Sequence, residues 1–229
     1  MYRLNITEEI QSMKIYTFFT DSHKPMLKFF MDSFKFNENI DLIIRYMPQQ
    51  CEAGDFMTPG WNDTMKRKVQ YVLDSLDVTP EGEVFVHSDC DVLFIKDCYE
   101  QIISEMGDSD IIFQSDQGEL CMGFFACKSS DSTRKFFTDV LDNLHRYYHD
   151  QEAARKILKA NNESTYQLKT KLFSNQFFNY GMNSKKTKYY QGEENIVVPD
   201  DICMFHANFC DKRDNKIKLL DKVKSKFNV

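Results

Sequence analysis

Two kinds of apolar segment alternate along the first part of the chain, and this alternation limits the possible folds more than any other feature. Residues 14–19, 41–46 and 83–87 are short runs rich in β-branched and aromatic residues, which are typical of buried strands. Between them, apolar residues recur at helical spacing over 27–34 and 65–76. Strand, helix, strand, helix, strand predicts an α/β fold with a mostly parallel sheet covered by helices.

The second half of the chain is less regular but continues in the same way. No internal repeat or low-complexity linker divides the 229 residues, so we expect one domain over 1–229. Further elements are predicted as strands at 110–114, 122–127, 196–198 and 202–205, helices at 130–148, 151–159 and 212–226, and a polar interruption at 161–165.

Composition excludes several classes of partner. The chain carries 35 acidic residues against 29 Lys and Arg, a net charge of −6. This balance argues against binding to a nucleic-acid backbone, which needs clustered cations. No apolar run approaches the ~18–20 residues that span a bilayer, and residues 1–12 lack an apolar signal-peptide core. We therefore expect no transmembrane segment and a cytoplasmic protein.

Two carboxylates spaced two apart end the third predicted strand. Asp89 and Asp91 follow the apolar run Val84-Phe-Val-His-Ser88. In extended backbone, residues i and i+2 point to the same side, so the two side chains can converge. Ligand crevices of open α/β sheets lie at the carboxyl ends of strands. A divalent cation there would relieve the repulsion between two carboxylates, so the pattern predicts a metal site; a solvated turn is the alternative.

Other residues separate this pair from a chance match. Asp108 and Asp110 repeat the spacing but precede their strand, where a turn and a helix or strand cap are expected. His206 follows a short apolar run and is a candidate third metal ligand, because neutral imidazole binds divalent ions. Lys212 and Lys216 come soon after it, and either can neutralise a diphosphate as a point charge.

In this order, the residues resemble the nucleotide-diphospho-sugar transferases, which are glycosyltransferases with the GT-A fold, over about 14–219. The matching segments are Phe85-Val-His-Ser-Asp-Cys-Asp91, Met122-Gly-Phe-Phe-Ala-Cys127, the pair Asp150-Gln151, and His206-Ala-Asn208 with a following Lys. Taken alone, Asp150 and Gln151 would be an ordinary helix start. The chain is also similar to compact glycosyltransferases of large algal viruses.

The resemblance implies a GT-A fold with a mixed, mainly parallel central sheet flanked by helices. It implies a nucleotide-binding half at about 13–97 and an acceptor and sugar half at about 98–229. Variable loops at 49–61 and 161–178 would line the acceptor groove.

It also implies a role for each matching residue. The ligands of a Mn²⁺ or Mg²⁺ ion would be Asp89, Asp91 and His206. The nucleotide sugar would contact Thr20, Asp21, His23, Lys68, Asp89, Lys212 and Lys216. Catalysis at the transferred sugar would involve Asp150, Gln151 and Asp116, with Gln114 a further candidate for a sugar or acceptor contact.

The implied function is a metal-dependent glycosyltransferase that moves a hexosyl or pentosyl group from a nucleotide-diphosphate donor, UDP-sugar favoured, to a glycan or other hydroxyl acceptor. A cation and a lysine would neutralise the leaving diphosphate. Asp150 can stabilise or trap an oxocarbenium-like sugar, and we favour retention; inversion would use Asp116 or Asp150 as a base. The span between His206 and Lys212 lacks the Gly of many retaining members, which leaves the choice between Lys212 and Lys216 open.

Two other interpretations compete. The segment 86–92 also fits haloacid-dehalogenase-like phosphatases, with Asp89 as nucleophile, Asp91 as acid/base and Asp200-Asp201 as the later metal-binding pair. That motif normally opens its domain, whereas a long α/β segment precedes it here. A non-catalytic nucleotide-sugar-binding protein on the same fold would bind without turnover, and the intact set of Asp89, Asp91, Asp150 and His206 argues against it.

Overall fold

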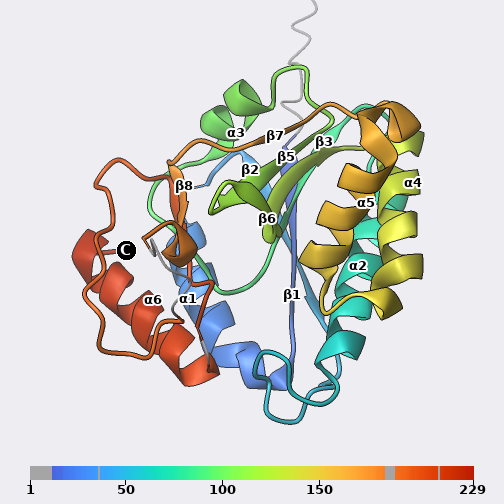
Figure 1. The fold of residues 1–229 in the computed structure, drawn as a ribbon. Helices are drawn as coiled ribbons and strands as arrows, with labels where there is room; N and C mark the ends of the chain where they lie inside the picture. Colours follow the sequence, from blue (N-terminus) through green and yellow to red (C-terminus); the bar gives the residue numbers. More distant parts are fainter. Residues whose placement is uncertain (1–11, 36, 184–188, 211) are drawn as a thin grey trace, which may run out of the picture.

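A six-stranded sheet runs through the middle of the molecule in the order β2-β1-β3-β6-β5-β7 (Figure 1). The computed structural model describes residues 12–35, 37–183, 189–210 and 212–229. The strands of this sheet are β1 (Met13–Phe19), β2 (Ile40–Tyr46), β3 (Val84–Ser88), β5 (Ile111–Asp116), β6 (Glu119–Lys128) and β7 (Thr170–Leu172). Strand β6 is antiparallel to β3 and β5, and the other neighbouring pairs are parallel. The predicted mixed, mainly parallel sheet is confirmed.

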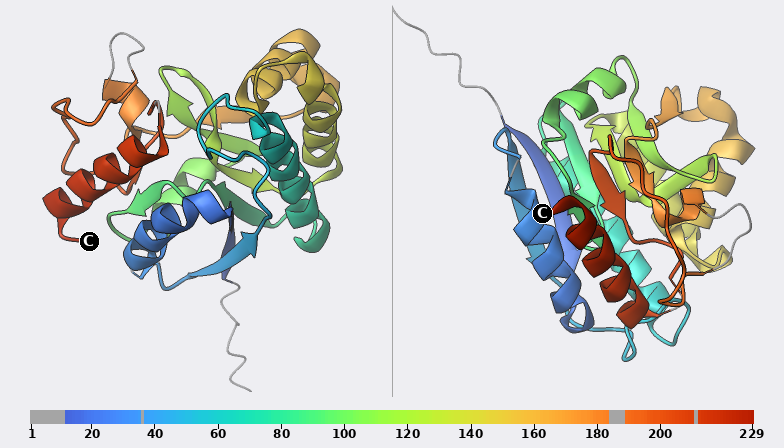
Figure 2. Two further views of the ribbon diagram at one scale, coloured as in Figure 1. Left: turned by 90° about the horizontal axis from the view of Figure 1, so that it is seen from below. Right: turned by 90° about the vertical axis from the view of Figure 1, so that its left-hand side faces the viewer.

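Helices cover both faces of the sheet. They are α1 (Lys24–Phe34), α2 (Trp61–Val78), α3 (Tyr99–Met106), α4 (Asp131–Asn143), α5 (Asp150–Tyr166) and α6 (Arg213–Phe227), with short 3₁₀ segments at Asp21–His23, Leu144–Arg146 and Tyr180–Asn183. Helices α2, α4 and α5 share one core with the sheet, and α1 and α3 share another on the opposite face. Helix α6 packs beside α1 (Figures 1 and 2). Within the described residues, no helix has both the length and the apolar character needed to cross a bilayer.

A second, three-stranded sheet begins directly after β3. It contains β4 (Val92–Phe94), β9 (Met204–His206) and β8 (Phe177–Asn179), with β9 in the middle. Strand β4 is antiparallel to β9, and β8 is parallel to it. The chain therefore passes from the large sheet to the small one between Ser88 and Val92, which is the position of the Asp-x-Asp segment.

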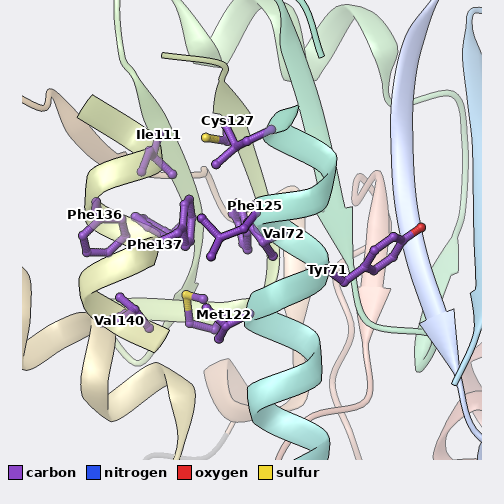
Figure 3. Close-up of a cluster of buried hydrophobic side chains, with 14 of the residues drawn as sticks. Tyr71, Val72, Ile111, Met122, Phe125, Cys127, Phe136, Phe137 and Val140 are labelled. Atoms are coloured by element: carbon purple, nitrogen blue, oxygen red, sulfur yellow. The ribbon is translucent and has the colours of Figure 1, made fainter. Parts of the chain in front are cut away.

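Buried aromatic rings fix the helices against β6. Phe125 of β6 stacks on Phe137 of α4 with ring centroids 5.3 Å apart, and Phe136 lies 4.9 Å from Phe137. Val72 of α2 faces this group from the other side (Figure 3). Large rings bury much apolar area in few residues, so this core holds β6 firmly next to the site described below.

Three predicted elements differ in the structure. The interruption predicted at 161–165 is wrong, because α5 continues to Tyr166, whose buried ring and hydroxyl bond to Asp139 (2.6 Å) tie the helix end to α4. The strand predicted at 196–198 is wrong as well. Val197 is 78% exposed, and the segment pairs with no strand among the described residues. The helix predicted over 130–148 ends at Asn143 and is followed by a 3₁₀ turn.

Candidate active site

A pocket of about 510 Å³ lies where the carboxyl ends of β1 and β3 meet the small sheet. Nearly all of the site residues predicted from sequence line it: Thr20, His23, Lys68, Asp89, Asp91, Asp116, Asp150, Gln151, His206, Lys212 and Lys216. Asp21 is not part of this lining; its exposed carboxylate pairs with Lys24 (2.7 Å) and accepts a hydrogen bond from Tyr46 (2.9 Å). The structure thus brings the predicted residues together, while their individual roles stay predictions.

Asp89, Asp91 and His206 form one cluster, in which one ligand atom of each lies within 4.8 Å of the others. These side chains do not meet because of an extended backbone, as we expected from the sequence. The chain bends at Cys90 and Asp91 and then enters β4, where Val92 pairs with His206 of β9. The bend, together with strand pairing in the second sheet, therefore brings the cluster together.

The other Asp-x-Asp pair lies at the opposite end of the sheet, as its position before a strand predicts. Asp110 precedes β5, and its carboxylate accepts a hydrogen bond from the backbone N–H of Lys169 (2.8 Å). Asp108 pairs with the Lys169 ammonium at 2.8 Å on the exposed surface. This pair connects β5 to β7 and has no part in the pocket.

Backbone contacts and a glycine give the cluster its shape. The backbone N–H of Asp89 donates to the carbonyl of Gly123 (2.7 Å), and that of Ala207 donates to the carbonyl of Asp91 (2.9 Å). A Cβ at Gly123 would lie 2.3 Å from His206 Cε1 and 3.0 Å from Asp89 Oδ2. Strand β6 therefore needs a glycine at this position, because any side chain would displace the cluster.

Asp91 is the most strongly held carboxylate of the cluster. It is buried, Lys216 bonds to its Oδ2, and His206 Nε2 lies 3.4 Å from its Oδ1. Burial raises the pKa of Asp91, but Lys216 and His206 outweigh burial and hold it well below its usual range. Burial likewise lowers the pKa of His206, but Asp91 outweighs this and raises it to about 10.

The cluster fits a hard divalent cation. Two carboxylates and an imidazole are ligands that Mn²⁺ and Mg²⁺ accept. Asp91 Oδ1 is buried, makes no hydrogen bond within the described part of the chain and lies 3.4 Å from His206 Nε2, so it is available as a ligand beside the imidazole.

Lys68 connects this cluster to Asp150. It lies on α2 with 3% of its side chain exposed, and its ammonium is 2.9 Å from Asp89 and 3.1 Å from Asp150. Burial lowers the pKa of Lys68, but the two carboxylates outweigh burial and raise it, so the lysine stays charged. Lys68 therefore fixes the distance between the end of β3 and the start of α5.

Asp116 and Gln151 form a second polar pair. Gln151 Nε2 donates to Asp116 Oδ2 (2.7 Å), and its Oε1 accepts from the backbone N–H of Met122 (3.3 Å). Both ends of the Gln151 amide are thus engaged. Burial raises the pKa of Asp116. Gln114, predicted as a sugar or acceptor contact, is fully buried behind His206 and does not line the pocket.

Uncharged polar side chains just after β1 form one corner of the pocket. His23 Nδ1 lies 3.0 Å from the Thr20 hydroxyl and 2.8 Å from that of Ser22, and Gln49 Oε1 accepts from the backbone N–H of Ser22 (3.0 Å). Burial and the nearby charge of Lys216 lower the pKa of His23 to about 4. An uncharged imidazole among hydroxyls suits hydrogen bonding to neutral polar groups.

Aromatic rings that are partly exposed line one part of the pocket; we call this set the aromatic mouth. It consists of Phe56, Trp61, His149, Tyr189 and Phe209. Phe56 lies 4.9 Å from Trp61, 6.1 Å from His149 and 6.2 Å from Tyr189, and Tyr189 lies 5.9 Å from Phe209, between ring centroids. The predicted acceptor loop 49–61 supplies two of these rings. Of the other predicted acceptor loop, 161–178, the residues 166–178 do not line the pocket.

Comparison with protein families decides the assignment. The sequence model of the nucleotide-diphospho-sugar transferases matches residues 10–220. The chain belongs to this family. The phosphatase interpretation does not fit this assignment. The Asp-x-Asp segment does not open the domain, because β1, α1, β2 and α2 precede it, and the residues expected as the later metal-binding pair lie elsewhere. Asp200 and Asp201 are exposed and lie outside the pocket lining, and Asp200 pairs with Lys226 (2.8 Å).

Solved glycosyltransferases share the transferase's fold. The galactosyltransferase LgtC, in complex with donor and acceptor sugar analogs, has a TM-score of 0.55 at 16% identity, over 94% of this chain and 95% of that chain. A glycosyltransferase involved in glycosylation of the major capsid of PBCV-1, an algal virus, has a TM-score of 0.55 at 9% identity, over 92% and 99%. The predicted GT-A fold and the resemblance to glycosyltransferases of algal viruses are confirmed.

One further comparison concerns length. The glycosyltransferase GlyE of Streptococcus pneumoniae TIGR4 has a TM-score of 0.57 at 13% identity over 94% of this chain, which spans 64% of the GlyE chain. A search of curated protein sequences found no match.

Sequence reasoning missed some residues in or behind the transferase pocket. His87 of β3 is fully buried and does not line the pocket, but its Nε2 lies 3.5 Å from Asp89 Oδ1, and its place beside the Asp-x-Asp pair could have identified it. Gln49, Phe56 and Trp61 lie in the predicted acceptor loop 49–61, whereas the other rings of the aromatic mouth, His149, Tyr189 and Phe209, come from segments far apart in the chain. No spacing pattern connects them.

Proposed function

We propose that this transferase is a metal-dependent glycosyltransferase that uses a nucleotide-diphosphate sugar, with a UDP-sugar favoured as donor and Mn²⁺ or Mg²⁺ as cofactor. The observation that carries the proposal is the buried cluster of Asp89, Asp91 and His206, with Lys216 beside it, at the carboxyl ends of the strands. The leaving nucleoside diphosphate gains negative charge as the glycosidic bond breaks, and a cation held by this cluster, together with Lys216, would neutralise it.

Different residues of the pocket would bind different parts of the donor. Asp89, Asp91 and His206 would hold the cation, which when bound neutralises the departing diphosphate. Lys216 and Lys212 line the same side of the pocket and would bond to phosphate oxygens. The corner of Thr20 and His23 would receive ribose and base, since hydroxyls and a neutral imidazole can pair with their polar edges.

Asp150 would act at the sugar. Lys68 holds its carboxylate near the metal cluster, which is where the anomeric carbon of a bound donor would lie. A carboxylate there can stabilise or trap the oxocarbenium-like sugar, and we favour the retaining outcome. Gln151 would hold Asp116 in place, and the raised pKa of Asp116 suits it as a base if the route inverts instead.

The aromatic mouth would receive the acceptor. One of its rings, His149, directly precedes Asp150 in the chain, and Phe56 packs against His149. The mouth therefore lies next to the proposed position of the sugar. Aromatic faces bury the apolar C–H face of a sugar ring, whose hydroxyls stay free to react. We therefore propose a glycan acceptor.

A ligand screen tests the proposal. UDP- and GDP-sugars are screened by thermal shift with and without Mn²⁺, first with the wild type and then with Asp91→Ala. We expect Mn²⁺-dependent stabilisation by at least one nucleotide in the wild type and none in the variant. Absence of metal-dependent stabilisation by every nucleotide in the wild type would overturn the proposal.

A further inference from the structure

Gln114 is a fully buried polar residue next to an irregularity in the sheet. Strands β5 and β6 change register between Phe113 and Gln114: Phe113 pairs with Phe125, whereas Gln114 pairs with Cys121. Register shifts of this kind redirect side chains and often lie beside active sites. Here the shift lies opposite Gly123, the residue that makes room for the metal cluster.

The amide of Gln114 has only one possible orientation. Its Nε2 lies 3.1 Å from the carbonyl oxygens of both Phe177 and Phe178 in β8. A carbonyl can only accept, so the NH₂ group must face these two oxygens and its two hydrogens are used there. The Oε1 atom then faces His206 Nδ1 at 2.8 Å.

This orientation determines which ring nitrogen of His206 would keep its hydrogen when a cation binds to the other. Because Gln114 Oε1 can only accept, His206 Nδ1 must donate and therefore keep a hydrogen. His206 Nε2 is left as the nitrogen that faces the cluster, 3.4 Å from Asp91 Oδ1. It also lies on the side where Gly123 leaves space.

We propose that Gln114 is a positioning residue of the metal site, which fixes the ring orientation and the metal-binding tautomer of His206 through its bonds to β8. The inference rests on the proposed metal-dependent function and adds a residue that does not touch the pocket. Hydrogen-bond partners of this kind typically change metal affinity by about 10- to 100-fold when they are removed.

A purely structural role is the alternative, because Gln114 also joins β5 to β8. Asn179 provides a matched control. It is fully buried, its Nδ2 donates to the Ser115 carbonyl of β5 (2.6 Å), and its Oδ1 accepts from the backbone N–H of Met182 (3.1 Å). It thus joins the same two strands through a buried amide. Although Asn179 is the backbone ladder partner of His206 between β8 and β9, its amide atoms bond to Ser115 and Met182 and not to the imidazole.

The test is a Mn²⁺ titration of the full chain, followed by the electron paramagnetic resonance signal of free Mn²⁺, without any sugar donor and then with saturating UDP. It compares the wild type with Gln114→Met, Gln114→Glu and Asn179→Leu. We expect Gln114→Met to weaken Mn²⁺ binding by about 10- to 100-fold. Gln114→Glu keeps an acceptor opposite Nδ1, and in its protonated form it keeps one donor toward the Phe177 and Phe178 carbonyls, so it should recover most of this loss. Asn179→Leu should bind as the wild type does.

The outcomes separate the two proposals. Equal weakening in Gln114→Met and Asn179→Leu, or no weakening in Gln114→Met, would overturn the role of Gln114 while leaving the metal-dependent function intact. A wild type that binds no Mn²⁺ under either condition would instead contradict the metal dependence, and the role of Gln114 would fail with it. Thermal unfolding of each variant identifies any loss of folding. If Gln114→Met does not fold, Gln114→Leu, which also lacks an acceptor for His206 Nδ1, takes its place with the same expected weakening.

Discussion

The floor and the mouth of the pocket are built in opposite ways. The floor consists of buried or half-buried charged groups that contact one another: Lys68, Asp89, Asp91, Asp150, His206 and Lys216. The aromatic mouth consists of rings carried by loops and helix starts, with Phe56 39% and Tyr189 40% exposed. The floor is held by strand ends and ion pairs, while the mouth is held by ring contacts at the surface.

This difference fits the donor and the acceptor of the proposed glycosyltransferase. A diphosphate and a cation need charges that are already in place when the bond breaks, because reorganising charges costs catalytic rate. An acceptor needs shape and apolar area, which surface loops can vary without disturbing the core. We therefore expect changes in the floor to affect chemistry and stability, and changes in the mouth to affect acceptor affinity alone.

The largest effect is expected for Asp91→Asn. The change removes the charge that pairs with Lys216 and His206, so Mn²⁺ affinity should fall by more than about 100-fold and sugar transfer should become undetectable. A Mn²⁺ titration measures the affinity, and a transfer assay measures the rate of sugar transfer. The matched control is Asp108→Asn, in the exposed Asp-x-Asp pair, which should change neither; equal effects in the two variants would remove the distinction between the pairs.

Asp150→Asn is expected to have the next largest effect. The side chain keeps its shape but loses the charge that would act at the sugar, so the transfer rate should fall by about 10²- to 10⁴-fold. Donor affinity, measured by calorimetry, should stay close to that of the wild type. A transfer rate that is unchanged would exclude Asp150 from the chemistry.

Lys68→Met tests whether the floor contributes to the stability of the fold. The change leaves Asp89 and Asp150 without their buried cation, so the free energy of unfolding should fall by about 3–5 kcal/mol in urea denaturation. Lys66→Met, which affects an exposed pair with Asp63 on the same helix, should change it by less than about 0.5 kcal/mol. A similar small change in both variants would contradict a tightly coupled floor.

The smallest effect is expected at the mouth. Trp61→Ala removes one ring face, so the acceptor KM should rise by roughly three- to tenfold while hydrolysis of the donor without acceptor stays constant. Val78→Ala, an exposed apolar residue at the other end of α2, serves as the control. A slower donor hydrolysis in Trp61→Ala would place this ring in the chemistry and break the separation of floor and mouth.

The sequence carries enough information to predict most of the floor. Strand hydrophobicity located the end of β3, and the order of Asp89, Asp91 and His206 along the chain predicted that they would meet, as they do. The reason was only partly correct, because the chain bends at Asp91 and leaves the large sheet. Local periodicity cannot reveal which sheet a short strand joins, and β4 and β9 are three residues long.

Only part of the mouth could be predicted: Phe56 and Trp61 lie in the loop 49–61 expected at the acceptor groove, whereas His149, Tyr189 and Phe209 were not assigned to it. Its rings come from segments with no common spacing, and they meet only because the folded sheet brings these segments to one edge. Gln114 shows a related limit. Its strand placement was predicted, but the register shift that turns it toward His206 depends on pairing with β6, which one strand's sequence does not encode.

The most direct test of the account is the release of nucleoside diphosphate from a panel of UDP- and GDP-sugars, measured with Mn²⁺ and with EDTA. We predict release from at least one donor by the wild type with Mn²⁺, and none with EDTA or by Asp91→Asn. Equal release in EDTA or by the variant would contradict the account. So would a wild type that releases no nucleoside diphosphate from any donor.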